Sequence, residues 1–448
     1  MPDMAVINST HSSGDPSLPQ GPLMIVSTLE AQGYEMEFHD YQTQHMPDQG
    51  NPESFYQFLR GVQADIIGIS VFSSSLPTVL LAVRKLKEEY PGKTIVLGGP
   101  AATDTPDDIL RFFPVDIVVR GEGEVTVVEM MRAIESGTDL AEVAGLSFRR
   151  NGDIISTPNR PRIADLDALP YPAYDRIDFR DYGSSLGTVY SRGCPYECSF
   201  CSVHSVWQRK MTHRSPESLA EEIAYVVGSH PGEIAEVAYH DDTFVLDKKR
   251  VTRLLGALRE RGVEMPWFCY GRVNLMPESL IKTMADFNCS KVLFGIESGS
   301  DTVLKRIQKR FTAEEARRTV DLTRSYIPSI INTYIYGFPF ETMEAFHETV
   351  FSVLDDRQKG IISNLYLLCP LPQSPLHSEF RDILRFSPRY HSLLGTPTYF
   401  ARYPEIVAEI VAHPQLFSAY YHYEHPGLDD KMTFLELLDK KGLKVAFS

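Results

Sequence analysis

Three cysteines stand close together near the middle of the chain. Cys194, Cys198 and Cys201 follow one another as C-x3-C-x2-C, whereas the other three cysteines are isolated. Three thiolates on one short loop can each bind one iron of a [4Fe-4S] cluster, and the iron without a protein ligand stays open to a substrate or cofactor. The spacing therefore predicts a catalytic iron–sulfur centre in this loop.

A zinc site is the alternative for the same cysteines. A structural zinc ion needs four ligands, and His204 or His213 would have to supply the fourth. Zinc explains only the cysteines, whereas the cluster also agrees with several segments further along the chain. We therefore favour the cluster.

The elements that must position this loop are predicted by alternating β-rich and amphipathic segments. Six βα units are too few for a complete eight-unit barrel, so the pattern favours an open, partial (β/α)6 barrel over residues 185–375. The expected strands are Thr188–Ser191, Glu236–His240, Trp267–Tyr270, Lys291–Gly295, Ile330–Tyr336 and Ile361–Leu368.

The first 140 residues show a second alternating pattern, typical of an α/β domain with a doubly wound, Rossmann-like parallel sheet. Ligands of such domains bind beyond the carboxyl ends of the strands. A linker over 141–184 and a small C-terminal cap over 376–448, with a helix near Thr433–Lys441, complete the expected organisation. The expected strands are Met4–Asn8, Tyr34–Phe38, Asp65–Ser70, Thr94–Gly98 and Asp116–Val119.

The second domain resembles the radical S-adenosyl-L-methionine (SAM) superfamily. Its signature is the same cysteine spacing with an aromatic residue before the last cysteine, here Phe200, and matching segments follow at the ends of later strands: His240–Phe244, Gly295–Ser300 and Tyr336–Thr342. The resemblance implies that these segments hold SAM. For Arg272 and Arg310, which would pair with its carboxylate, a surface salt bridge is the alternative. The implied SAM-binding residues are Phe200, Asp241, Asp242, Arg272, Glu297, Ser298, Arg310, Gly337 and Pro339.

The first domain resembles the cobalamin-binding domain that precedes the barrel in one group of radical SAM enzymes. That domain carries D-x-H-x-x-G, S-x-L and Gly-Gly elements, and the last two match Ser74 to Leu76 and Gly98–Gly99. The first element lacks its Asp, so His11 as a cobalt ligand and an ordinary loop histidine both stay open. The resemblance also implies that Gly121 and Glu122 contact the corrin. The alternative is that they form a tight turn before a helix.

Together the resemblances imply an enzyme that cleaves SAM to a 5'-deoxyadenosyl radical and methylates an unactivated carbon of a small molecule or peptide. The alternatives are a radical rearrangement, cyclisation or ring contraction without methyl transfer, and a first domain that binds no cobalamin. A non-catalytic corrinoid or redox-sensing module is less consistent with the retained SAM segments. The expected cofactors are a [4Fe-4S] cluster, SAM and cobalamin, with flavodoxin or ferredoxin as reductant.

Composition limits the partners and the location. Asp and Glu (59) outnumber Lys and Arg (44), which gives a formal charge of -15. A nucleic acid partner, as for an RNA-modifying methylthiotransferase, is not expected, because the chain offers no basic field for a phosphate backbone. No apolar stretch is long enough to span a membrane. We expect a cytoplasmic enzyme.

Overall fold

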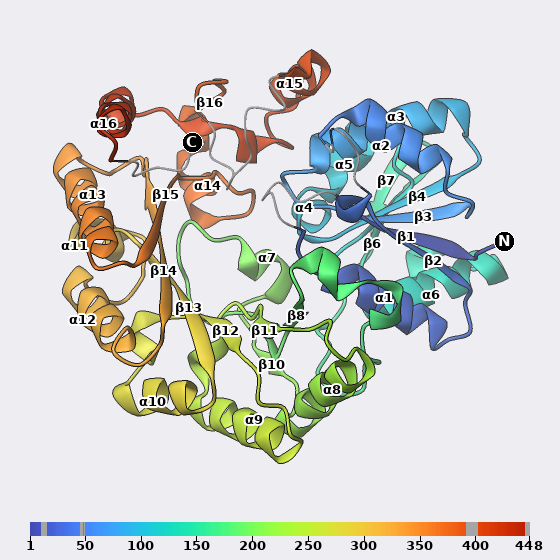
Figure 1. Ribbon diagram of the computed structural model, residues 1–448. Helices are drawn as coiled ribbons and strands as arrows, with labels where there is room; N and C mark the ends of the chain where they lie inside the picture. Colours follow the sequence, from blue (N-terminus) through green and yellow to red (C-terminus); the bar gives the residue numbers. More distant parts are fainter. Residues whose placement is uncertain (10–15, 45–47, 49, 391–401, 444–448) are drawn as a thin grey trace. The chain divides into compact units, whose positions relative to one another are not determined.

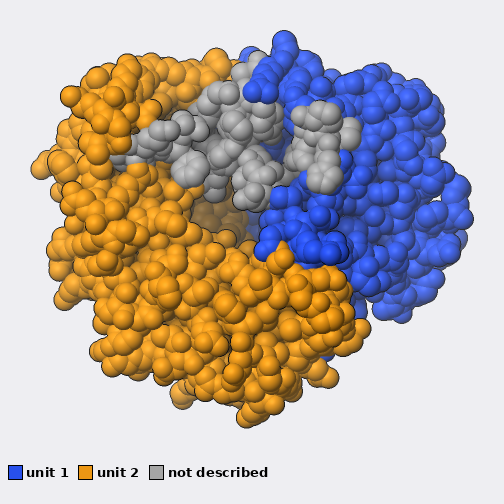
Figure 2. Space-filling model, in the orientation of Figure 1, with its two compact units in different colours: residues 1–183, 205–208, 396–419 blue, residues 184–204, 209–395, 420–448 orange. Residues whose placement is uncertain are grey.

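The structure is a computed structural model that describes residues 1–9, 16–44, 48, 50–390 and 402–443. The chain forms two compact units, coloured separately in Figure 2. Unit 1 comprises residues 1–183, 205–208 and 396–419, and unit 2 comprises 184–204, 209–395 and 420–448. Among the described residues, none of the helices combines the length and the apolarity that a membrane span requires.

Unit 1 is built on a seven-stranded sheet in the order β2-β1-β3-β4-β5-β6-β7. The first five strands run parallel, which confirms the doubly wound domain, and the strand order changes direction between β1 and β3. Ligands of doubly wound sheets bind at such a switch point. The strands are β1 (Met4–Asn8), β2 (Met36–Asp40), β3 (Ile66–Ser70), β4 (Thr94–Gly98), β5 (Ile117–Val119), β6 (Leu146–Arg150) and β7 (Asp153–Ser156).

Two features of this sheet differ from the sequence-based expectation. β2 begins at Met36 rather than Tyr34. The β6–β7 hairpin, expected in the linker, extends the sheet because β6 pairs antiparallel with β5. Leu146 and Phe148 of β6 are thereby buried in the core of unit 1.

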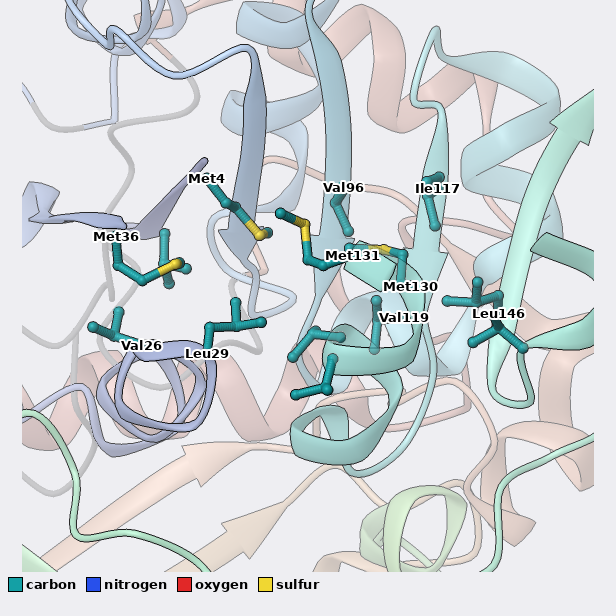
Figure 3. Close-up of a cluster of buried hydrophobic side chains, with 14 of the residues drawn as sticks. Met4, Val26, Leu29, Met36, Val96, Ile117, Val119, Met130, Met131 and Leu146 are labelled. Carbon is teal, nitrogen blue, oxygen red and sulfur yellow. The ribbon is translucent and has the colours of Figure 1, made fainter. Parts of the chain in front are cut away.

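Helices cover both faces of the unit 1 sheet (Figure 1). On one face α1 (Gln20–Glu30) packs against α6 (Gly123–Ser136), and on the other α2 (Pro52–Arg60) packs against α3 (Leu76–Glu89). Because both faces are covered, β1, β3, β4 and β5 are apolar along most of their length, whereas the edge strand β2 is more polar. Figure 3 shows the core between the sheet and α1 and α6, with Met4, Val26, Leu29, Met36, Val96, Ile117, Val119, Met130, Met131 and Leu146 labelled.

Three further helices belong to unit 1. α4 (Pro100–Asp104) and α5 (Pro106–Phe112) follow β4, and α15 (Pro404–Ala412) returns from late in the chain to contact α3. Glu409 of α15 pairs with Arg84 of α3 at 2.5 Å. The sequence pattern had not predicted α15.

Unit 2 is built on a parallel sheet of six strands in the order β8-β11-β12-β13-β14-β15. This confirms the partial barrel with one strand from each predicted βα unit. The strands are β8 (Ser185–Thr188), β11 (Glu236–Tyr239), β12 (Trp267–Gly271), β13 (Cys289–Glu297), β14 (Ser329–Tyr336) and β15 (Ile362–Leu367).

The first barrel strand was misplaced by the sequence pattern, which put it at Thr188–Ser191. The strand ends at Thr188, and the backbone N–H groups of Tyr190 and Ser191 donate to the carboxylate of Asp241 instead of to a neighbouring strand. The chain then forms the short strand β9 (Ser191–Arg192), which pairs antiparallel with β10 (Thr212–His213).

Helices follow the strands of unit 2 on the outside of the sheet (Figure 1). They are α8 (Pro216–Ser229), α9 (Lys248–Glu260), α10 (Glu278–Asp286), α11 (Asp301–Arg306), α12 (Ala313–Thr323) and α13 (Met343–Gln358). Unit 2 also contains α14 (Pro375–Phe380), the antiparallel pair of β16 (Leu384–Arg385) and β17 (His422–Tyr423), and α16 (Leu428–Lys440). α16 begins earlier than the predicted Thr433, directly after Gly427.

Candidate functional site

The cysteine loop leaves β9 and is held by backbone hydrogen bonds from distant parts of unit 2. Ser199 N donates to Ile307 O at 3.2 Å, and Leu376 N donates to Ser199 O at 2.8 Å. Within the loop, Cys201 N donates to Cys198 O at 3.2 Å. The backbone of Ser199 is thus held through both its N–H and its carbonyl group. The helix α7 (Val203–Trp207) follows the loop.

The three thiols of this loop have the chemistry that an iron–sulfur cluster needs. All three are partly exposed, and burial raises the pKa of Cys201 to about 12. Such a thiol becomes a thiolate only beside a positive charge, which iron supplies. Among the described residues no three His, Cys, Asp or Glu side chains are arranged to hold one metal ion. Cluster ligands each bind a different iron and need not converge on one point.

Arg272 lies against the cysteine loop. It follows β12, is only 7% exposed, and places Nη1 3.9 Å from Cys198 Sγ. Its guanidinium stacks on Tyr196, 3.6 Å from the ring centroid, and donates to the carbonyl of Lys309. Arg272 is therefore a fixed positive charge beside a predicted cluster ligand, and not the surface salt bridge considered for it.

Arg310 has a different environment. Its Nη2 lies 2.6 Å from Glu197 Oε2, and both side chains are about half exposed (56% and 47%). This is the surface ion pair that was the alternative for Arg310. The pair still connects the cysteine loop to the loop after α11, in which Gln308 and Arg310 both have positive φ (+61° and +58°).

The acidic segment after β11 contacts the cysteine loop and the backbone that leads into it. The carboxylate of Asp241 accepts hydrogen bonds from Tyr190 N at 3.0 Å and from Ser191, and burial raises its pKa to about 7. Asp242 accepts from Gly193 N at 3.2 Å. Thr243 Oγ1 lies 3.4 Å from Cys194 Sγ. Asp241, expected to contact SAM, thus has hydrogen bonds that shape the backbone leading into the loop.

The segment after β13 contains Glu297 and Ser298. Glu297 has φ +74° and binds the buried Nζ of Lys309 through Oε1 at 3.2 Å. The hydroxyl of Ser298 lies 2.9 Å from Thr349 Oγ1 of α13 and accepts from Ser300 N. Glu297 is therefore charge-compensated, and Ser298 fixes the turn against α13.

The segment after β14 meets the cysteine loop through aromatic rings. Phe338 packs edge-on to Phe200 with ring centroids 6.3 Å apart, and Lys309 Nζ lies 5.9 Å from the Phe200 ring centroid. Gly337 has φ +86°, and a Cβ there would lie 2.6 Å from Leu367. Pro339 follows in the same loop, partly buried. Phe200 and Lys309 thus bring together the cysteine loop and the segments after β13 and β14.

In unit 1, four of the predicted cobalamin-binding residues lie at or after the carboxyl ends of β3 and β4, next to the switch point. Ser74 and Leu76 are buried at the start of α3. A Cβ on Gly98 would meet no atom within 4 Å, whereas one on Gly99 (φ +94°) would lie 2.9 Å from Val71 O. The open space at Gly98 fits a surface on which a cofactor can lie. Position 99 requires glycine because its backbone has a positive φ and a side chain there would collide with Val71.

The Gly-Glu turn after β5 leads into α6. Gly121 has φ +73°. Glu122 Oε2 accepts hydrogen bonds from Arg162 Nε and Ile163 N, both at 2.9 Å. Arg162 in turn stacks on Trp207 at 4.9 Å and donates to its carbonyl. His11 lies outside the described residues.

Tyr196 and Lys309 are site residues that the sequence analysis missed. Tyr196 is inside the cysteine motif, and its ring carries the stacked Arg272. Lys309 lies in a loop without a recognisable motif, between Gln308 and Arg310, so nothing in the local sequence indicates that its side chain is buried. Both contribute through contacts between loops, which spacing within one loop does not reveal.

Comparisons with known proteins agree with this arrangement. Residues 188–353 match the model of the Radical SAM superfamily, and residues 10–131 match the B12 binding domain. The first match contains the cysteine loop and the segments after β11, β13 and β14. The second contains most of the unit 1 sheet.

The relatives of the chain include methyltransferases. The chain is 33% identical over 299 residues to an uncharacterized methyltransferase of Pyrococcus horikoshii, covering 66% of this chain and 65% of that protein. It is 27% identical over 389 residues to the cobalamin-dependent radical SAM methyltransferase TokK of Streptomyces tokunonensis, covering 79% and 55%. In both cases the match spans less than two thirds of the relative.

A solved structure shares the fold. The radical SAM methyltransferase TsrM of Kitasatospora setae superimposes with a TM-score of 0.75 at 18% identity, covering 100% of this chain and 93% of that one. The family matches confirm both resemblances found in the sequence. The chain therefore contains a B12 binding domain followed by a radical SAM domain, and these domains imply SAM, an iron–sulfur cluster and cobalamin as its cofactors.

Proposed function

We propose that the protein is a cobalamin-dependent radical SAM methyltransferase that acts on an unactivated carbon of a small molecule or peptide. The observation that carries this proposal is the convergence of the cysteine loop with the segments after β13 and β14, through Phe200, Phe338 and Lys309. A B12 binding domain in the same chain and methyltransferases among the relatives support methyl transfer.

The residues of the site have the following roles in this proposal. Cys194, Cys198 and Cys201 would hold three irons of a [4Fe-4S] cluster, and Arg272 keeps a positive charge beside them. Phe200 and Phe338 form an apolar wall that excludes water from the SAM pocket. When bound, the cluster and SAM supply a 5'-deoxyadenosyl radical that removes hydrogen, and cobalamin supplies the methyl group.

We further propose that Glu297 and Pro339 contact SAM, and that Gly98 with Ser74 and Leu76 faces cobalamin. Glu297 lies at the carboxyl end of β13 and Gly98 at that of β4, where ligands of these folds bind. A flavodoxin or ferredoxin as reductant and a cytoplasmic location are part of the same proposal, as is the division of the chain into a cobalamin-binding domain, a radical SAM barrel and a C-terminal cap.

Radical cyclisation or rearrangement without methyl transfer is the second candidate. The chain is 29% identical over 280 residues to the anaerobic magnesium-protoporphyrin IX monomethyl ester cyclase of a Synechocystis strain, covering 61% of this chain and 56% of that protein. A cyclase would use the same cofactor-holding residues.

The test begins with protein purified without oxygen from cells supplied with cobalamin. We expect about four irons and one cobalt per chain. The protein is then incubated with SAM and a low-potential reductant, and the nucleoside products are quantified. A methyltransferase forms S-adenosylhomocysteine together with 5'-deoxyadenosine, whereas the second candidate forms no S-adenosylhomocysteine. Protein without iron, or without any SAM cleavage, would contradict both candidates.

A further inference from the structure

Lys431 is a cation in the interior of unit 2, far along the chain from every motif described above. Its side chain is 0% exposed, as is that of its partner Glu341. Nζ donates to Glu341 Oε2 at 2.9 Å and to the carbonyl of Glu341 at 2.8 Å. Burying two charges is unfavourable unless their mutual geometry compensates for the lost hydration. A pair held this closely therefore fixes the relative positions of the two segments that carry it.

Glu341 belongs to the loop after β14, the segment that brings Phe338 to Phe200. The same Oε2 atom that binds Lys431 accepts a hydrogen bond from Gly337 N at 2.8 Å. Glu341 N donates to Phe338 O at 2.9 Å. The Glu341 carboxylate thus ties the end of the loop to its beginning at Gly337, which has a left-handed backbone conformation. α13 begins two residues after Glu341. The loop's conformation depends on this one side chain.

Lys431 comes from α16, which packs on β14 and α13. Tyr336 OH lies 2.9 Å from Met432 Sδ, and Phe434 packs edge-on to Phe346 with ring centroids 6.0 Å apart. Lys431 Nζ itself lies 5.9 Å from the Phe346 ring centroid. These contacts pack α16 against β14 and α13 and thereby hold Lys431 next to Glu341.

We propose that Lys431 is a positioning residue for SAM. It holds Glu341, and through Glu341 the loop Gly337–Thr342, in the conformation that presents Phe338 to the cysteine loop. The inference rests on the proposed function, because that function assigns this loop to the SAM pocket. It makes α16 a part of SAM binding, although this helix carries no cofactor motif.

The test compares Lys431→Met with Lys440→Met in the full-length holoenzyme. Lys440 is exposed near the end of the same helix, so its replacement removes a charge from α16 without touching the loop. SAM affinity is measured by equilibrium dialysis, and KM for SAM and kcat are measured from 5'-deoxyadenosine formation. Iron content, cobalt content and circular dichroism report whether each variant is intact.

For Lys431→Met we expect Kd and KM for SAM to rise at least about tenfold, because a small misplacement of a positioning group is costly. We expect kcat at saturating SAM, iron and cobalt to change little, and Lys440→Met to match the wild type. An intact Lys431→Met protein with wild-type affinity and KM would overturn the inference.

A second variant covers the case in which Lys431→Met does not fold. Glu341→Gln combined with Lys431→Met removes both charges, and replacing a whole buried pair is often tolerated. Weakened SAM binding by this folded double variant supports the inference, and wild-type binding overturns it. If the wild type binds no SAM, the proposed function fails. If it does and the variants bind equally well, only the role of Lys431 fails.

Discussion

Arg272 Nη1 lies 3.9 Å from the Sγ of Cys198 while the same guanidinium stacks on Tyr196, 3.6 Å from the ring centroid. The stacking and the hydrogen bond to Lys309 O hold the arginine in a buried position. A positive charge fixed beside a cluster ligand acts on the reduction potential, because reduction adds negative charge to the cluster. The arrangement of these two side chains is therefore open to electrochemical measurement.

Arg272→Met is expected to lower the midpoint potential of the reconstituted cluster by roughly 60 mV, the change that corresponds to a tenfold loss in the one-electron equilibrium. The lost cation no longer stabilises the reduced state. An anaerobic redox titration followed by electron paramagnetic resonance measures the shift. Arg253→Met is the control, because Arg253 on α9 is exposed and pairs with Glu217 on α8. Equal potentials in the Arg272 variant and the wild type would contradict this role.

Cys198→Ala is expected to abolish SAM cleavage and to reduce the iron content, because the cluster loses one of its three protein ligands. Cobalamin binding by unit 1 is expected to persist, since Cys198 belongs to unit 2. Iron analysis and the visible absorption of the bound corrinoid check both statements. Cys289→Ala is the matched control, because Cys289 is buried at the start of β13, at the opposite end of the strand from Glu297. Wild-type turnover by Cys198→Ala would exclude the cluster assignment.

Gly299→Ala is expected to lower the free energy of unfolding by about 1–3 kcal/mol and to weaken SAM binding. The added Cβ would lie 2.3 Å from Ser352 Oγ and 2.4 Å from Glu348 O of α13, so the turn that carries Ser298 must move. Urea unfolding and equilibrium dialysis with SAM measure the two effects.

Gly256→Ala is the control for this substitution. Gly256 lies inside α9, and a Cβ there meets no atom within 4 Å. Because alanine is the better helix former, we expect this variant to be about 0.5–1 kcal/mol more stable than the wild type. A Gly299→Ala protein as stable as Gly256→Ala would show that the turn accommodates a side chain.

Asp104 is expected to make the stability of unit 1 depend on pH. Burial raises its pKa from the ordinary 3.8 to about 7, and Ser205 Oγ donates to its Oδ1 at 2.6 Å. Between these two pH values the folded protein retains a proton that the unfolded chain has lost, so the free energy of unfolding falls as pH rises from about 4 to 7. Asp104→Asn cannot titrate and lacks this contribution. Urea unfolding at a series of pH values should show the two profiles diverging over this interval, and parallel profiles would contradict the prediction.

The sequence alone was sufficient for the two α/β domains and for the cysteine loop. Alternation of apolar segments is a local property of the backbone, and strands such as Thr94–Gly98 were predicted with the bounds that the structure shows. The β6–β7 hairpin was assigned to the linker because its short strands carry no signal of the neighbour they join. The first barrel strand was shifted because Asp241, on another segment, captures the N–H groups of Tyr190 and Ser191.

The sequence by itself determined which residues can bind iron. It also determined that the segments expected to hold SAM follow the ends of strands. Only the tertiary structure decided what surrounds them: Arg272 on Tyr196, Lys309 at Glu297, and Lys431 at Glu341. A charged side chain is buried only where a partner compensates its charge. That partner can stand 90 positions away, as for Lys431 and Glu341, and no local pattern in the sequence records such a distance.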